Sequence, residues 1–139
     1  MKDRLIKDWM TADPVIITPD TNMSDAHALM RKHRIRRLPV VDNRQRLVGI
    51  VSLSDIHEAE PSDATSLSVH EMTYLLSNLL VKEIMTTMVH TVNPEQTMAE
   101  AARMMMELKI GGLPVVEGGK LVGILTESDI FRMVVELYA

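Results

Sequence analysis

The sequence predicts a mixed α/β (α+β) fold that is built from two tandem copies of one β-α-β-β-α unit. The chain has 139 residues, of which 46% are hydrophobic and 24% are charged, and this composition is typical of globular proteins. When the sequence is compared with itself at an offset of 75 residues, Leu38–Val41 falls on Leu113–Val116. After a one-residue gap the offset becomes 74, and Leu47–Ile56 falls on Leu121–Ile130. Matches in the same order along both halves indicate an internal duplication.

Each copy opens with a short β-branched run that ends near a proline, which predicts a strand. The two runs are Val15–Thr18 and His90–Val92. A helix is expected next, over residues 23–34 and 98–109, because methionine and alanine recur there at helical spacing. Thr97 and Glu100 have the spacing of a capping box, and Asn22 and Asp25 form a weaker version of it.

Two further strands and a last helix complete each copy. The predicted strand pairs are 38–41 with 47–52, and 113–116 with 121–126, each joined by turn-forming residues. The last helix is expected to begin at Ser54 in the first copy and at Ser128 in the second. A unit of about 50 residues is too small to bury a sufficient core alone, so the two copies are expected to pack together.

The interval between the copies has no counterpart elsewhere in the chain. Its apolar residues lie on one face of an expected helix, which Ser68 and Glu71 would cap. The expected organisation is therefore a first repeat over 1–58, a linker with an amphipathic helix over 59–81 and a second repeat over 82–139. Open sheet edges and apolar surface predict a homodimer. The apolar residues expected to remain uncovered include Leu75, Leu76, Leu79 and Met133.

Composition and missing motifs exclude several classes of function. The absence of cysteine rules out disulfides, thiolate metal sites and cysteine nucleophiles. A net charge of −4 argues against a general nucleic-acid binder. The five histidines lack zinc-type spacing, and no catalytic motif is found, so neither a metal site nor an enzyme is expected. Without a signal peptide or a long apolar run, the expected location is the cytoplasm, away from membranes.

One motif occurs in both copies: a glycine, two apolar residues, a hydroxyl residue, two more residues and an aspartate. It supplies the pairs Ser52–Asp55 and Thr126–Asp129. Such a pair can simply cap a helix. The same geometry also suits a phosphate at the helix start and ribose hydroxyls on the aspartate. The residues alone leave both interpretations open.

A second motif is the basic run over residues 31–37, which carries five formal positive charges. Arg31, Lys32 and Arg34 are expected on a solvated helix face. Arg36 and Arg37 come directly before the strand of the first copy, where the second copy has glycines. Arginine is well suited to holding phosphate, so two unequal sites are expected.

With LPVVD…LVGIVSLSDI in one half and LPVVEGGKLVGILTESDI in the other, the chain resembles a pair of CBS domains, also called a Bateman module. The resemblance covers residues 5–57 and 80–136. A weaker similarity is to the N-terminal part of the acetoin-utilisation AcuB proteins. The resemblance implies two repeats related by a pseudo-two-fold axis. Clefts between them would bind AMP, ADP, ATP or S-adenosylmethionine as a regulatory ligand, with no other cofactor.

The resemblance also implies the residues of the ligand site. The aspartates would bind ribose, the hydroxyl residues would lie near ribose or phosphate, and the basic residues before the strand would bind phosphate. The strand residues would line the cleft, although ordinary packing explains each of them equally well. The expected ligand-binding residues are Val15, Ile17, Thr18, Arg36, Arg37, Leu38, Pro39, Ser52, Asp55, His90, Val92, Gly112, Leu113, Pro114, Thr126 and Asp129.

Two other functions remain open at this stage. The chain could be a structural dimerisation module whose clefts bind nothing, or, less favoured by its charge, a nucleic-acid binder using the basic run. The sequence does not identify the adenosine ligand, its number of phosphates or the effector protein that reads the signal. It also leaves open whether both clefts are filled and which cleft Arg36 and Arg37 serve.

Overall fold

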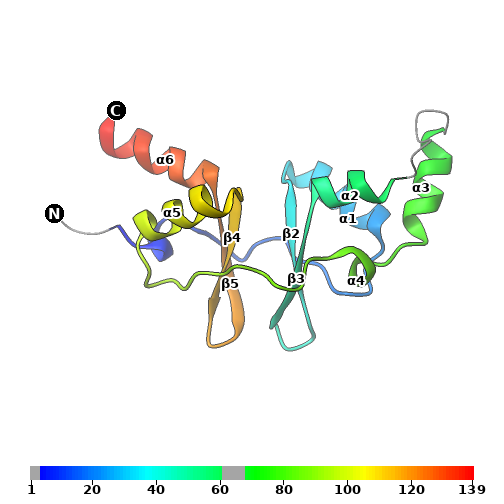
Figure 1. The fold of residues 1–139 in the computed structure, drawn as a ribbon, viewed down its shortest axis with the longest axis horizontal. Helices are drawn as coiled ribbons and strands as arrows, with labels where there is room; N and C mark the ends of the chain where they lie inside the picture. The colour runs from blue at the N-terminus through cyan, green and yellow to red at the C-terminus, as the bar shows by residue number, and fades with distance from the viewer. Residues whose placement is uncertain (1–3, 61–67) are drawn as a thin grey trace. The chain divides into compact units, whose positions relative to one another are not determined.

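The computed structural model describes residues 4–60 and 68–139 of the chain, which form two compact units (Figure 1). The first-repeat unit is Val15–Val89. The second-repeat unit is His90–Ala139 together with the N-terminal segment that ends at Pro14. The compact units are therefore divided differently from the segments 1–58, 59–81 and 82–139 expected from the sequence. The segment before each repeat packs on the other repeat.

Backbone hydrogen bonds explain why the N-terminal segment belongs to the second-repeat unit. The amide of Ile6 donates to the carbonyl of Gln96 at 2.9 Å, and the amide of Met98 donates to the carbonyl of Arg4 at 2.8 Å. In the first-repeat unit the segment after the linker is held in the same way, since Thr86 and Ile50 exchange backbone hydrogen bonds of 3.0 Å. Self-comparison of the sequence cannot detect this exchange of segments, because it aligns the segments without showing where they pack.

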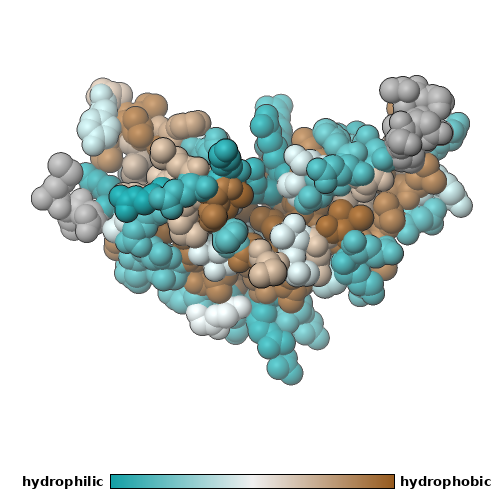
Figure 2. All heavy atoms as spheres, viewed as in Figure 1, coloured by the Kyte–Doolittle hydropathy of each residue, from teal (hydrophilic) through white to brown (hydrophobic). Residues whose placement is uncertain are grey.

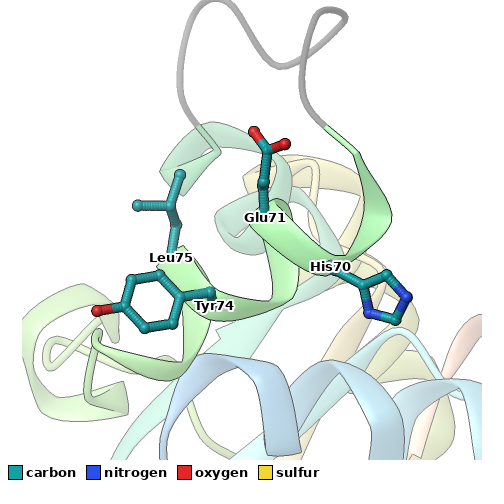
Figure 3. Close-up of a pocket in the computed structure, with 4 residues that line it drawn as sticks. All are labelled: His70, Glu71, Tyr74 and Leu75. Atoms are coloured by element: carbon teal, nitrogen blue, oxygen red, sulfur yellow. The ribbon is translucent and has the colours of Figure 1, made fainter.

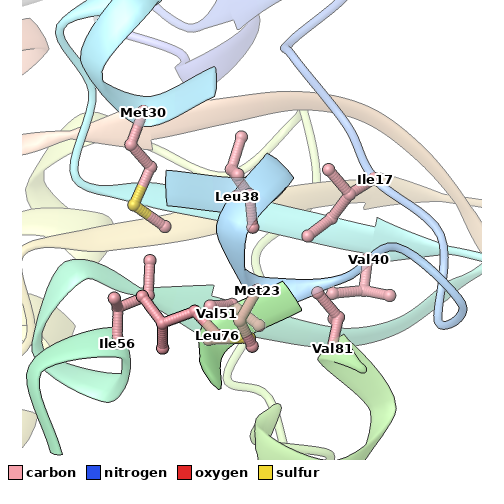
Figure 4. Packing of buried hydrophobic residues seen from close by; sticks show 10 residues of the cluster. Ile17, Met23, Met30, Leu38, Val40, Val51, Ile56, Leu76 and Val81 are labelled. Atoms are coloured by element: carbon pink, nitrogen blue, oxygen red, sulfur yellow. The ribbon is translucent and has the colours of Figure 1, made fainter. Parts of the chain in front are cut away.

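The first-repeat unit consists of a two-stranded antiparallel sheet covered by helices. Its elements are α1 (Met23–His33), β2 (Arg37–Val41), β3 (Leu47–Ser52), α2 (Leu53–Ala59), α3 (Val69–Ser77) and α4 (Val81–Ile84). The core gathers apolar side chains from each of these elements (Figure 4). Its buried members are Ile17, Met23, Ala26, Met30, Leu38, Val40, Val51, Ile56, Leu76 and Val81.

The second-repeat unit contains a three-stranded sheet in the order β1-β5-β4. Its elements are η1 (Ile6–Asp8), β1 (Thr11–Ala12), α5 (Met98–Leu108), β4 (Gly112–Glu117), β5 (Lys120–Thr126) and α6 (Glu127–Tyr138). The core has the same composition as that of the other unit, with methionine filling the space that aromatic residues would usually occupy. Its buried members are Ile6, Val92, Met98, Ala101, Met105, Leu113, Val115 and Leu125.

The helices and the paired strands lie within two residues of their predicted positions, and the predicted caps form. Asn22 accepts from the amide of Asp25 at 2.8 Å, and Thr97 accepts from the amide of Glu100 at 3.1 Å. The predicted strands over Val15–Thr18 and His90–Val92 are wrong as strands. Each is reduced to one parallel bridge, Ile17 with Val40 and Val92 with Val115. Prolines near both bridges lack an amide proton, so the ladders do not extend.

The linker helix forms as α3 and packs on α1, with Ser68 accepting from the amide of Glu71 at 3.1 Å. The expectation that Leu76 would stay uncovered is wrong, because this side chain is 3% exposed and belongs to the core. Instead, the large exposed apolar side chains concentrate on α6, and brown spheres mark this helix in Figure 2. They are Phe131, Val134, Val135, Leu137 and Tyr138. Among the described residues, no helix is long and apolar enough to span a bilayer.

Candidate functional site

In the first-repeat unit, the basic pair lies beside the start of α2. The amide of Leu53, the first residue of α2, donates to the carbonyl of Arg36 at 2.7 Å. Arg37 and Ser52 are direct partners in the antiparallel register of β2 and β3. The fold therefore brings Arg36, Arg37 and the Ser52–Asp55 pair together, and we call these four residues the first-repeat site.

The second-repeat unit has the same backbone arrangement. The amide of Glu127, the first residue of α6, donates to the carbonyl of Gly111 at 3.1 Å. Gly112 and Thr126 are direct partners in the register of β4 and β5. Gly111, Gly112, Thr126 and Asp129 form the second-repeat site, which has no arginine on its strand.

The hydroxyl–aspartate pair of the first-repeat site forms a capping box. The amide of Ser52 donates to Oδ2 of Asp55 at 2.7 Å, and the amide of Asp55 donates to Oγ of Ser52 at 3.2 Å. Both side chains are partly buried. A structural role for this pair is therefore present without any ligand. Any ribose bound there would add its hydrogen bonds to a carboxylate that already has a fixed orientation.

The pair of the second-repeat site is held differently. Thr126 donates to Oδ2 of Asp129 from its amide at 2.9 Å and from its hydroxyl at 3.4 Å. Asp129 is only 7% exposed, the buried charged residue of the described chain. Its other oxygen, Oδ1, faces Nη2 of Arg132 at 3.4 Å. Burying a carboxylate costs free energy unless hydrogen-bond partners of this kind replace the water that it loses.

Arg132 also joins the site to the N-terminal segment, a connection that the sequence did not reveal. Its Nη2 donates to the backbone carbonyl of Trp9 at 2.8 Å, and its guanidinium lies 5.2 Å from the centre of the Trp9 ring. The spacing of Asp129 and Arg132, three residues apart on a helix, was the available signal for half of this cluster. No local signal could pair Arg132 with a residue that lies 123 positions away.

The remaining predicted site residues fall into two groups. Thr18 and His90 are exposed and Val15 is partly buried, so their side chains are accessible to a ligand. The side chains of the second group lie in the cores or beside them, so contact with a ligand there would need backbone atoms. These residues are Ile17, Leu38, Pro39, Val92, Leu113 and Pro114.

A shallow hollow of about 370 Å³ lies on α3 (Figure 3). It is lined by His70, Glu71, Tyr74 and Leu75, which all belong to this one helix. None of the predicted ligand-binding residues contributes to it. Across residues 4–60 and 68–139, no group of three or more histidine and acidic side chains is arranged to hold a metal ion.

The chain matches the sequence model of the CBS domain twice, over residues 6–62 and 81–136. It is 39% identical over 124 residues to the inosine-5′-monophosphate dehydrogenase of Korarchaeum cryptofilum, covering 88% of this chain. The match spans 23% of that enzyme's length.

Solved structures agree with the sequence match. The acetoin utilization protein AcuB from Vibrio cholerae aligns with a TM-score of 0.83 and 34% identity, covering 98% of this chain and 93% of that one. The CBS domain pair of protein MJ0100, in complex with 5′-methylthioadenosine and S-adenosyl-L-methionine, aligns with a TM-score of 0.82 and 28% identity, covering 98% and 99%. CBSX2 of Arabidopsis thaliana, in complex with AMP, aligns with a TM-score of 0.82 and 29% identity, covering 98% of this chain and 99% of that one. The chain belongs to the CBS domain family and carries two CBS repeats.

Proposed function

We propose that the chain is a regulatory module that binds an adenosine-containing ligand and catalyses no reaction. The observation that carries the proposal is the placement of a hydroxyl–aspartate pair beside the start of a strand in both units. At that start stand Arg36 and Arg37 in one unit, and Gly111 and Gly112 in the other. The complexes of MJ0100 and CBSX2 support it, because both contain adenosine compounds on a fold of this kind.

Each group of the ligand has a chemical counterpart in the first-repeat site. The Asp55 carboxylate, fixed by the amide of Ser52, can accept hydrogen bonds from the two ribose hydroxyls. Arg36 and Arg37 can donate charge-assisted hydrogen bonds to a phosphate. We propose the equivalent ribose contact at Asp129, where the strand glycines add no charge. A phosphorylated adenosine such as AMP therefore suits the first-repeat site better than the second-repeat site.

The regulatory step requires a ligand that prefers one packing of the protein over another. An effector protein would then read the change. We further propose that the chain forms a homodimer through α6, on which Phe131, Val134, Val135, Leu137 and Tyr138 are exposed. A structural dimerisation module is the second candidate function. It is favoured by the capping hydrogen bonds of Asp55, which are complete without a ligand.

Isothermal titration calorimetry of nucleotide-stripped protein tests the main proposal. AMP, ADP, ATP, S-adenosylmethionine and NAD are titrated separately into the full chain. We expect saturable binding of at least one of the first four ligands. If all of them give only heats of dilution at millimolar concentration, the sensor proposal is wrong and the dimerisation module remains.

The assembly is tested separately by light scattering at micromolar protein concentration. The wild-type chain should scatter as a species of twice 15.6 kDa. Replacing Val135, which is 61% exposed on α6, with Glu should produce the monomer, because it places a charge in the apolar face. Lys109→Glu, an exposed position on the turn after α5, is the matched control and should leave the dimer intact. A monomeric wild-type chain would refute the proposed dimer.

A further inference from the structure

The cluster of Trp9, Asp129 and Arg132 has no counterpart in the other repeat. At the offset of 74, Arg132 aligns with Glu58, and at the offset of 75, Trp9 aligns with Ile84. Glu58 has no N–H groups to replace those of the guanidinium, and Ile84 has no aromatic ring for a cation to lie against. The two aspartates thus share a position in the repeat but differ in their surroundings.

The guanidinium of Arg132 joins two parts of the second-repeat unit. Its Nη2 lies 2.8 Å from the Trp9 carbonyl and 3.4 Å from Oδ1 of Asp129. The planar guanidinium makes both contacts while it lies near the Trp9 ring, and the tetrahedral ammonium of a lysine, on a side chain of different shape, would not keep all three contacts in the same geometry. The Trp9 ring beneath the cation limits where the guanidinium can move.

Trp9 lies on a segment that is bound to the unit by backbone hydrogen bonds and by the buried side chain of Ile6. The amides of Ile6 and Lys7 donate to carbonyls of Gln96 and Pro94, and Thr11 pairs with Ile124. After Pro14 the same segment continues into Val15 and Ile17 of the first-repeat unit. In that unit Ile17 forms a single parallel bridge with Val40 of β2, so the docked segment is continuous in sequence with the first-repeat unit.

A ribose bound at Asp129 would change the contact between Asp129 and Arg132. Oδ2 already accepts two hydrogen bonds from Thr126, so a pair of ribose hydroxyls must also use Oδ1, the oxygen that Arg132 faces. The contact of 3.4 Å is long for a charge-assisted hydrogen bond, so Oδ1 has capacity for a new donor.

We propose that Arg132 is a positioning residue that couples ligand binding at Asp129 to the docking of residues 4–14 on the second-repeat unit. The proposal rests on the proposed function, since it assumes that an adenosine ligand uses Asp129. It assigns to Arg132 and Trp9 a role in transmitting the signal, beyond the ligand contacts themselves.

The emission of Trp9 provides the test, because it is the single tryptophan of the chain. AMP is titrated into the full-length wild-type protein while emission is recorded, and calorimetry measures binding in parallel. We expect the emission to change with the binding curve of the second-repeat site and to lose this response in Asp129→Ala but not in Asp55→Ala.

Arg132→Lys separates the coupling from a simple charge effect. It keeps the positive charge near Asp129, so AMP affinity should fall by no more than about fivefold, the effect of one hydrogen bond. The Trp9 response should nevertheless disappear. Glu58→Gln, at the equivalent position of α2, is the matched control and should keep the response. An unchanged Trp9 response in Arg132→Lys, or AMP binding at Asp129 without any emission change in the wild type, would overturn the proposal.

A ligand-free measurement decides the coupling even if AMP does not bind. Asp129→Asn and Arg132→Gln should each shift Trp9 emission and accelerate hydrogen exchange of the Ile6 and Met98 amides, while Asp55→Asn should do neither. If Asp129→Asn leaves emission and exchange unchanged, the coupling is refuted. Failure of AMP, ADP, ATP and S-adenosylmethionine to bind, together with a positive ligand-free result, would refute the proposed function alone.

Discussion

The two repeat units have the same backbone and different charges. In both, the first amide of the last helix donates to the residue before the Leu-Pro strand, at 2.7 Å in one unit and 3.1 Å in the other. In both, the strand register shifts between the two valines of the Leu-Pro-Val-Val sequence, which are Val40 and Val41 in one unit and Val115 and Val116 in the other. The first-repeat site carries its arginines on the strand, whereas the second-repeat site has glycines there and Arg132 on the helix.

This difference shows which features the duplicated fold requires and which can vary. Backbone hydrogen bonds and core packing retain the same form, because a change there would unfold the unit. The charged side chains around the aspartates, such as Arg36 and Arg132, can vary because they are exposed. Two sites with one scaffold can therefore prefer different ligands, one bearing a phosphate and one without.

Replacing the aspartates should produce the largest effect, and each replacement should weaken binding at one site only. Asp55→Ala or Asp129→Ala should each weaken binding at its own site by roughly 1–3 kcal/mol, the cost of losing hydrogen bonds to a charged acceptor. Loss of the cap should also lower stability by about 0.5–2 kcal/mol. Calorimetry and thermal unfolding of the same variants separate these effects. Lower stability with unchanged affinity for every adenosine ligand would leave only the capping role.

Gly49 of β3 and Gly123 of β5 should instead show that the two scaffolds are equivalent. A Cβ on Gly123 would lie 2.9 Å from the carbonyl oxygen of Thr11 and 2.7 Å from Sδ of Met10. A Cβ on Gly49 would meet Thr86 and Met85 at 3.0 Å and 2.6 Å. Alanine at either position should therefore cost about 1–3 kcal/mol of stability, as overpacking usually does. Chemical denaturation measures it, and a loss confined to one glycine would show that the exchanged segments are not held equally.

Much of this arrangement could be predicted from the sequence, and the reason is local. The helices with their caps and the paired strands depend on spacing and turn chemistry within about 20 residues, and the duplication appears directly as matches at offsets of 75 and 74 residues. The segments around Ile17 and Val92 were predicted as strands but form only single bridges. The prediction was wrong because β-branched residues favour strands even where prolines prevent a ladder.

The contacts that the sequence did not reveal all join distant residues. The docking of residues 4–14 on the second repeat depends on backbone hydrogen bonds and on the burial of Ile6 against residues about 90 positions away, which no local pattern shows. Arg132 was missed for the same reason, since its partner Trp9 lies at the other end of the chain. The sequence predicted the hydroxyl–aspartate pairs and the basic pair as candidate site residues, but it did not predict the contact between Asp129 and Arg132.

The strand arginines should sharpen the difference between the sites. Replacing Arg36 and Arg37 with Gln should reduce AMP affinity at the first-repeat site by about tenfold and leave adenosine affinity nearly unchanged, because only the phosphate is lost from the contact. Added salt should weaken AMP binding less in this variant than in the wild type. Calorimetry at two salt concentrations measures both. Equal losses for adenosine and AMP would show that the pair supports the fold.

A smaller difference concerns His27, which aligns with Ala102 of the second repeat. Burial, reinforced by the charge of Arg31, holds the pKa of His27 below its usual value. Since the folded protein then binds fewer protons than the unfolded chain, His27 lowers the free energy of unfolding as the pH falls through about 6.5 and below. His27→Ala should remove a fraction of this acid sensitivity in thermal melts between pH 5 and 8. Identical pH profiles for variant and wild type would show that His27 does not contribute.

Binding of AMP to the wild-type chain and to the double variant Asp55→Ala/Asp129→Ala decides whether the duplicated motif is a ligand site. Calorimetry is carried out on nucleotide-stripped protein, with thermal unfolding to establish that the variant is folded at the temperature used. We expect saturable binding to the wild type and none to the folded double variant. Equal affinity in both proteins would show that AMP binds elsewhere and that the two aspartates serve only as helix caps.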